Sequence, residues 1–151
     1  ANLPCILEPN SLSRSDFKRP DGLTLYPYKR GKSLVWDVTV SDTLAPTNIS
    51  LSAKKGGKVA ENREKSKLTK YNNLAEKYVI TPISIETLGS WGSKGLKLIK
   101  DIGSRVKMVS QDPRSTSYIF QAIGMAIQRG NGTSVLGTIG NSPGLEEILL
   151  F

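Results

Sequence analysis

The sequence contains no histidine, and this absence narrows the chemistry open to the protein. Without imidazole, no His-based catalytic triad, zincin motif or histidine-ligated zinc site can form, and no histidine can act as a general base. A metal ion would have to be held by carboxylate and carbonyl oxygens, which suit Mg²⁺ or Mn²⁺. The sequence therefore limits metal chemistry to oxygen-bound cations.

Cysteine and long apolar runs are also scarce. The single cysteine, Cys5, excludes an internal disulfide framework and makes a reducing compartment the more natural setting. No apolar run approaches the roughly 20 residues that cross a bilayer, and the first residues lack the basic-then-apolar order of a signal peptide. We therefore expect a soluble protein, nuclear or otherwise intracellular, that is not secreted and does not bind membranes.

The distribution of apolar residues predicts a hairpin in the first third of the chain. Residues 23–28 and 34–40 each read as a strand, and the segment KRGKS between them carries a glycine suited to a turn. A shorter strand or turn is expected upstream, in PCILEPNSL. We therefore expect antiparallel strands at the start of the fold.

The remaining chain alternates between helical and extended patterns. After a loop at 43–57, residues 60–78 have a helical pattern, and the segment YVITPISIETLG is typical of a strand buried inside a sheet. Two more helices are predicted, one in SKGLKLIKDIGSRVKMV and one from Asp112 and Pro113 to a stop at Gly130. This order predicts a single domain, 1–151, of the α/β (α+β) class, with a central mixed β-sheet flanked by α-helices.

The net charge of +8 is unevenly distributed along the chain. Residues 54–77 carry eight basic and three acidic side chains, against six and five in 1–53 and seven and five in 78–151. Such a run is either a solvated helix face or an electrostatic footprint for a polyanion. The charge alone leaves both interpretations open.

Asp37 stands at the centre of an otherwise apolar predicted strand. Side chains alternate along a strand, so Asp37 shares one face with Val35 and Thr39, while the other face of 34–40 is wholly apolar. If Asp21 opens the preceding strand, a strand spacing of about 4.8 Å can bring the two carboxylates together. Their repulsion would then favour a shared proton or a shared divalent cation.

Two lysines of the predicted helix are placed to approach these acids. On a helical wheel, Lys67 falls inside the apolar arc centred near Tyr71, and Lys70 falls at its edge. Each feature also has a simpler explanation: Asp21 as part of a turn, Asp37 as a structural carboxylate, and Lys67 as a snorkelling side chain. Only the combination favours a functional site.

Four segments of the chain, in this order, resemble a known nuclease family. They are RPDG, then WDVT across the hairpin, then KLTKY and ITPISIETLG. The combination resembles the restriction-like endonuclease domain at the end of site-specific retrotransposons that lack long terminal repeats, and solitary reading frames derived from such elements. These domains belong to the PD-(D/E)XK nuclease superfamily. The likeness covers residues 19–89, roughly half of the chain.

The resemblance implies a restriction-endonuclease-like core and a metal-dependent DNA endonuclease that hydrolyses phosphodiester bonds. Asp21 and Asp37 would be the catalytic carboxylates that hold Mg²⁺ or Mn²⁺. Lys67 or Lys70 would be the catalytic lysine, and Arg19 would lie beside the scissile strand.

Two positions bear on how far the resemblance extends. In the parent superfamily a lysine stands two residues after the second acid, where this chain has Thr39. The retrotransposon branch takes its lysine from the following helix instead, yet Thr39 is equally compatible with a domain that has lost cleavage and kept binding. A further superfamily carboxylate would correspond to Glu8, for which a surface acid at a strand end is the simpler interpretation.

DNA is the expected partner, contacted mainly through its phosphates. Two alternatives stay open: a catalytically inactive nucleic-acid-binding module with the same fold, and a structural or protein-interaction domain with a solvated basic helix. A homodimer, association with a reverse transcriptase or another upstream domain, and an origin as an excised fragment are all compatible with the pattern. The basic residues expected to contact DNA are those of the 54–77 segment, Arg63 in particular, together with Arg14, Lys18, Arg19, Lys29 and Arg30.

Overall fold

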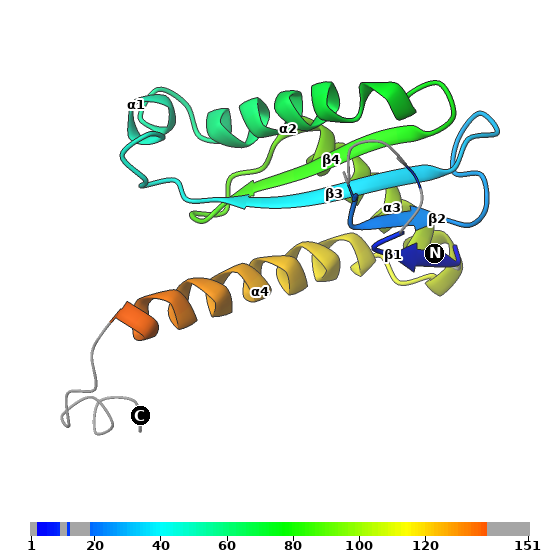
Figure 1. The fold of residues 1–151 in the computed structure, drawn as a ribbon. Coiled ribbons are helices and arrows are strands. Elements are labelled where there is room, and N and C mark those ends of the chain that lie inside the picture. Colours follow the sequence, from blue (N-terminus) through cyan, green and yellow to red (C-terminus); the bar gives the residue numbers. More distant parts are fainter. Residues whose placement is uncertain (1–2, 10–11, 13–18, 139–151) are drawn as a thin grey trace.

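The structure is a computed structural model that describes residues 3–9, 12 and 19–138 of the chain. In this part, helices cover both faces of a four-stranded sheet (Figure 1). In chain order the elements are β1 (Cys5–Leu7), β2 (Gly22–Thr24), β3 (Leu34–Ser41), α1 (Ile49–Ser52), α2 (Lys58–Lys70), the 3₁₀ helix η1 (Asn72–Leu74), β4 (Val79–Glu86), α3 (Ser93–Ser110) and α4 (Ser115–Thr138).

The sheet combines antiparallel and parallel pairing in the order β1-β2-β3-β4. Strand β2 is antiparallel to both β1 and β3, with Gly22 opposite Trp36 and Leu23 opposite Val35. Strand β3 is parallel to β4, and α2 supplies the crossover that a parallel pair requires. The predicted mixed sheet flanked by helices is therefore confirmed, and so is the antiparallel hairpin, although its first strand, expected over 23–28, covers only Gly22–Thr24.

Strand β3 divides its side chains between two helical layers. Leu34 joins the apolar core formed with α3 and α4, whereas Asp37 on the opposite face meets α2. Farther along the apolar face, Val38 and Val40 are 43% and 51% exposed, so the helices cover this face only in part. The buried apolar core on the α3 side consists of Leu34, Ile83, Ile85, Leu98 and Ile127.

Strand β4 lies at the edge of the sheet, which corrects the expectation of a strand inside it. Within the described residues it has β3 on one side and no strand on the other. Residues 82–86 are nevertheless buried, because α2 and α3 both pack against β4. Pro82 fits an edge position, since proline has no N–H to give to a second ladder. The apolar sequence of β4 therefore reflects burial by helices.

Two buried glutamates hold the N-termini of α2 and α3. Glu86, at the end of β4, accepts hydrogen bonds from two N–H groups in the first turn of α2 at 3.0 and 3.2 Å. Glu64, in the middle of α2, accepts from the N–H groups of Lys94 and Gly95 at 3.0 and 2.7 Å. Both glutamates are almost completely buried. These charge-assisted bonds satisfy N–H groups that lack partners within the helix, and they complement the helix dipole.

Two predicted boundaries in the middle of the chain differ from the structure. The predicted loop over 43–57 contains the short helix α1. The predicted helix over 60–78 ends at Lys70 and continues as η1, because Tyr71 leaves helical geometry with φ −104° and is buried. The single helix predicted over 60–78 is therefore two helices, α2 and η1, joined at the buried Tyr71.

Helix α4 overturns the predicted stop at Gly130. Asp112 does cap its start, since its Oδ1 accepts a hydrogen bond from the N–H of Arg114 at 2.8 Å. Gly130, however, lies in open space, and Ser134 donates to its carbonyl at 3.0 Å within the continuing helix. A helical glycine costs only about 1 kcal/mol, which is too little to end a helix by itself. Although α4 is long, no helix of the described residues has the length and apolar character needed to pass through a membrane.

Replacing Glu64 by alanine is expected to lower the free energy of unfolding by about 2–4 kcal/mol, because two N–H groups of α3 lose their acceptor. Glu64→Gln keeps an acceptor oxygen and should cost less. Urea unfolding followed by circular dichroism measures both. Glu61→Ala is the matched control, since Glu61 pairs with Lys55 and Lys58 at the surface and should cost less than about 1 kcal/mol. Equal losses for the two alanine variants would contradict the capping role.

Candidate active site

The ion pair between Asp37 and Lys67 lies between the sheet and α2. Asp37 is in the middle of β3 on the face that α2 covers, and Lys67 is in the last turn of α2. The Nζ atom of Lys67 is 3.0 Å from each carboxylate oxygen of Asp37. The side chain of Asp37 is 7% exposed and that of Lys67 is 27% exposed. The lysine therefore points toward the sheet, as its place on the helical wheel predicted.

This ion pair explains why an apolar strand carries a carboxylate. An unpaired carboxylate at this depth would cost several kcal/mol, and the ammonium group offsets that cost through two hydrogen bonds. A buried pair contributes little net stability compared with an apolar pair of the same size, but losing one partner is costly. Asp37 and Lys67 are therefore energetically coupled.

Asp21 is anchored to the residues on either side of Asp37. The N–H of Asp21 donates to the carbonyl of Trp36 at 3.1 Å, and its Oδ2 accepts from the N–H of Val38 at 2.5 Å. Within the described residues its Oδ1 accepts no hydrogen bond. The two acids are thus satisfied by different partners, a main-chain N–H and an ammonium group, so neither carboxylate requires a shared proton.

Gly22 permits the close contact between β2 and β3 that brings Asp21 to this place. A Cβ atom added to Gly22 would lie 2.0 Å from the indole of Trp36, which packs directly on the glycine backbone. The sequence PDG was interpreted as a turn as well as a site motif. Its glycine instead serves this close contact at the start of β2.

Lys70 has a different environment from Lys67. Its Nζ lies 4.7 Å above the centroid of the Tyr71 ring, which is a cation–π contact. Tyr71 is 1% exposed and donates a hydrogen bond from its hydroxyl to the carbonyl of Arg19 at 3.3 Å. The lysine that meets the carboxylate is therefore Lys67, while Lys70 covers the tyrosine that ties α2 to the RPDG segment.

Arg19 and Glu8 bind each other. The guanidinium of Arg19 forms an ion pair with the carboxylate of Glu8 and donates through Nε to the Glu8 carbonyl at 3.1 Å. Both side chains are at least half exposed. Glu8 is thus a surface acid just after β1, in agreement with the simpler interpretation of this residue.

A cleft of about 430 Å³ opens beside Lys67, between α2 and the end of β3. Three basic side chains of α2 line it: Arg63, Lys67 and Lys70. Thr39 and Ser41 line its opposite side. The cleft therefore has three cations on its helical side, and hydroxyl-bearing residues together with the carboxylate of Asp42 on the other side.

The hydroxyl groups beneath α2 were not identified as site features from the sequence. Thr39 Oγ1, Ser41 Oγ and Ser84 Oγ are buried without a hydrogen-bond partner in the described part of the chain. Thr39 is in register with Ser84, and strand alternation places both on the face of Asp37. Buried hydroxyls without partners are uncommon, so this cluster marks the interface as polar. Alternation along the strand from Asp37 would have placed Thr39 and Ser41 on the face covered by α2. The sequence did not show that β4, which carries Ser84, lies beside this strand.

The basic residues expected to contact DNA do not gather at one place. Arg63 lines the cleft beside Lys67. Lys29 and Arg30 instead occupy the hairpin turn, where the main chains of Lys29 and Lys32 form an antiparallel β-bridge. The remaining two predicted contacts, Arg14 and Lys18, lie outside the described residues.

Comparison with known proteins finds no matching family model and no matching curated protein. The resemblance to retrotransposon endonuclease domains therefore stays a prediction that rests on the residues themselves. Within the described residues, no three or more acidic or cysteine side chains are grouped to hold a metal ion. A cation at Asp21 and Asp37 would rely on two carboxylates, carbonyl oxygens and water, which suits Mg²⁺ because this ion usually keeps several waters.

Away from this site, Tyr28 and Asp101 have coupled pKa values. The Tyr28 hydroxyl donates a hydrogen bond to Asp101, which also forms an ion pair with Arg105 at 3.1 Å. Burial, and then the contact with Asp101, raises the pKa of Tyr28 from 10.0 to about 12. The hydrogen bond from Tyr28 is the main cause that lowers the pKa of Asp101; burial opposes it and the charge of Arg105 adds to it.

Replacing Lys67 by methionine is expected to lower the free energy of unfolding by about 2 kcal/mol, because Asp37 is left buried without its cation. The double variant Asp37→Asn, Lys67→Met should lose less than the sum of the two single variants, because it removes both charges. Urea unfolding of all three measures the coupling. Lys70→Met is the control and should cost less than about 1 kcal/mol. Strictly additive losses would show that the ion pair does not form in solution.

The hydrogen bond between Tyr28 and Asp101 predicts a separate step in an alkaline titration of the tyrosines. Comparing tyrosinate absorbance of wild type and Tyr28→Phe should reveal one group that ionises near pH 12. Since the folded state holds this proton more tightly, its contribution to stability is present below about pH 10 and is lost as the pH rises through 12. Asp101→Asn should move this step part of the way back toward 10. If Tyr28→Phe removed no separate step near pH 12, the contact between Tyr28 and Asp101 would be ruled out.

Proposed function

We propose that the protein is a metal-dependent DNA endonuclease domain that hydrolyses phosphodiester bonds. The observation that carries this proposal is the placement of Lys67 on Asp37, with Asp21 hydrogen-bonded to both neighbours of Asp37. Hydrogen bonds thus link Asp21, just before β2, to β3, and Asp37 of β3 to Lys67 of α2, and Lys67 lines a cleft together with Arg63 and Lys70. This combination matches the roles that the resemblance assigns to these residues.

Asp21 and Asp37 would hold the Mg²⁺ or Mn²⁺ ion. Asp21 is suited to this role because Oδ2 is fixed by the Val38 N–H, whereas Oδ1 accepts no hydrogen bond from the part of the chain that the structure describes. When bound, the ion supplies a Lewis acid that polarises a phosphodiester oxygen and helps to ionise water. Its charge would also compensate Asp37 whenever Lys67 turns to the substrate.

The lysines and Arg63 would act on the substrate directly. Lys67 can leave Asp37 to orient the attacking water or to stabilise negative charge that develops on the phosphate. Arg63 and Lys70, which line the same cleft, would hold neighbouring phosphates of the DNA strand. This grip is electrostatic, so DNA affinity should fall steeply as salt rises. Such an activity would place the protein in the nucleus or another intracellular compartment.

A nucleic-acid-binding module without cleavage is the second candidate, and one observation favours it. Lys67 occupies both oxygens of Asp37, and Thr39 stands where the parent superfamily has its lysine. In this case the Asp37–Lys67 pair would be structural and the cleft would still bind phosphates. The two candidates differ in cleavage and agree on salt-dependent binding.

Plasmid nicking with Mg²⁺ or Mn²⁺ separates the two candidates. Wild type should convert supercoiled plasmid to the open circle, and Asp21→Asn, Asp37→Asn and Lys67→Met should each lower the rate at least about 100-fold, the usual scale for a group that acts at the reacting phosphate. Asp112→Asn is the matched control, since it removes a carboxylate charge between α3 and α4, keeps the oxygen that caps α4, and should leave the rate unchanged.

Circular dichroism confirms that each variant is folded before its rate is compared. Salt-dependent binding by a wild type that never nicks DNA would favour the second candidate and end the proposal of cleavage. Nicking that survives Asp37→Asn would show that the activity belongs to a contaminant or to another site.

A further inference from the structure

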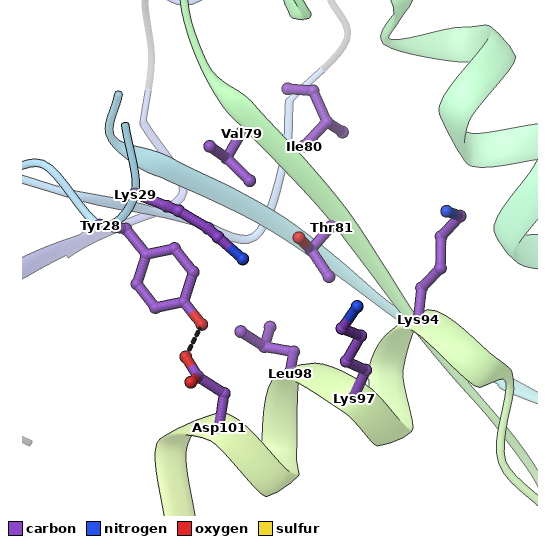
Figure 2. Close-up of a pocket in the computed structure, with 9 residues that line it drawn as sticks. All are labelled: Tyr28, Lys29, Val79, Ile80, Thr81, Lys94, Lys97, Leu98 and Asp101. Atoms are coloured by element: carbon purple, nitrogen blue, oxygen red, sulfur yellow. Dashed lines mark hydrogen bonds between the residues drawn. The ribbon is translucent and has the colours of Figure 1, made fainter. Parts of the chain in front are cut away.

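A second pocket, of about 220 Å³, lies on the α3 side of the sheet (Figure 2). Val79 and Thr81 of β4 and Leu98 of α3 form much of its lining. Val79 is in register with Leu34 of the apolar core, whereas Asp37 is on the opposite face of β3. The sheet therefore separates this pocket from the candidate active site.

Three lysines surround the pocket: Lys29 from the hairpin turn, and Lys94 and Lys97 from the start of α3. All three are exposed, and none of them forms an ion pair within the described residues. Figure 2 shows the amine ends of Lys29 and Lys97 directed toward the space beside Thr81. Ammonium groups gathered around one hollow raise the local positive potential and favour an anion there.

The carboxylate that borders the pocket is already engaged. Asp101 accepts the hydrogen bond from Tyr28 and forms its ion pair with Arg105, whose guanidinium also lies 4.5 Å from the centroid of the Tyr28 ring. This network fixes the tyrosine at the wall of the pocket. It also pairs the negative charge of Asp101 with Arg105 and, more weakly, with Lys29, so most of the positive charge of the three lysines is left for a ligand.

The open edge of β4 adds a main-chain donor. Val79 donates its N–H toward β3, to the carbonyl of Ser33 at 2.9 Å. Because main-chain groups alternate along a strand, the N–H of Ile80 points to the opposite, open edge. Ile80 lines the pocket, and at the next outward position Pro82 has no N–H. Among residues 79–82, Ile80 therefore has the one outward N–H, and this residue lines the pocket.

We propose that this pocket binds the phosphate group of a phosphate ester, with Lys29 and Lys97 contacting its oxygens and the Ile80 N–H donating a further hydrogen bond. A phosphate monoester carries close to two negative charges and three acceptor oxygens, which match several ammonium donors better than a carboxylate does. The apolar side chains of Val79 and Leu98 receive the organic part of the ester.

This inference does not depend on nuclease activity. The phosphate can belong to a free nucleotide or to a DNA backbone, and in both cases the contacts of the pocket are the same. A variant without the candidate catalytic pair, such as Asp37→Asn, should therefore keep phosphate binding. Failure of cleavage and failure of this pocket are consequently separate results.

The test is an NMR titration of the full chain with inorganic phosphate and with dTMP, at neutral pH and at an ionic strength of about 0.15 M. Both ligands should produce saturable shifts of the Ile80 and Thr81 amides. The double variant Lys29→Ala, Lys97→Ala should weaken the affinity at least about tenfold, the scale of losing charge-assisted hydrogen bonds. The matched control Lys100→Ala, Lys107→Ala removes the same charge from exposed positions on α3 and should keep wild-type affinity.

A short DNA duplex added to the dTMP complex identifies the source of the phosphate. Competition at the same amides assigns the pocket to the DNA backbone, and a duplex that leaves dTMP bound assigns it to free phosphate esters; either result supports phosphate binding. Shifts that do not saturate would overturn the proposal. Equal weakening by the two double variants would also overturn it, because binding would then follow net charge and not this pocket.

Discussion

Helix α2 is held to the rest of the protein by three buried carboxylates. Glu86 binds its first turn, Glu64 in its middle binds the start of α3, and Asp37 binds Lys67 in its last turn. The apolar residues that α2 buries are few, Val59 and Ala60, so packing alone does not fix its position. Charge-assisted hydrogen bonds are directional, and therefore they set both where α2 lies and how it is rotated about its axis.

The candidate active site follows from this polar attachment. If apolar contacts alone held α2, a small rotation would cost little, and Lys67 would lose its place above Asp37. The bonds from the first turn of α2 to Glu86, and from Glu64 in its middle to the start of α3, restrict that rotation. The hydroxyl groups of Thr39, Ser41 and Ser84 lie in the same layer, and none of them has a hydrogen-bond partner among the described residues. The interface between α2 and the sheet therefore holds the helix in place, while the proposed function requires Lys67 to exchange Asp37 for the substrate.

The sequence predicted those parts of the fold that depend on local patterns. Alternation along 34–40 gave the two faces of β3, and the helical wheel turned Lys67 toward the sheet. The wheel could not separate Lys67 from Lys70, because that choice depends on where Tyr71 is buried. Glu64 and Glu86 were missed because their partners are some 30 residues away in the chain, where no spacing rule applies. The position of β4 at the edge is a property of strand order, which local patterns do not contain.

The stop predicted at Gly130 failed for an energetic reason. A glycine ends a helix when it adopts a left-handed conformation and the chain turns away, and α4 instead continues along its own axis. Three other glycines, Gly31, Gly57 and Gly89, do have positive φ angles, and each lies in a turn or at the start of a helix. A glycine in the sequence therefore predicts the end of a helix only where the chain also turns away from the helix axis.

Pro82 has a consequence for how copies of this protein can associate. An open strand edge invites a second sheet to continue the ladder, and proline at an outward position removes the donor needed in the middle of such a continuation. The opposite edge, β1, offers only three residues. Extension of the sheet from one copy to the next is therefore disfavoured at both edges that the structure describes.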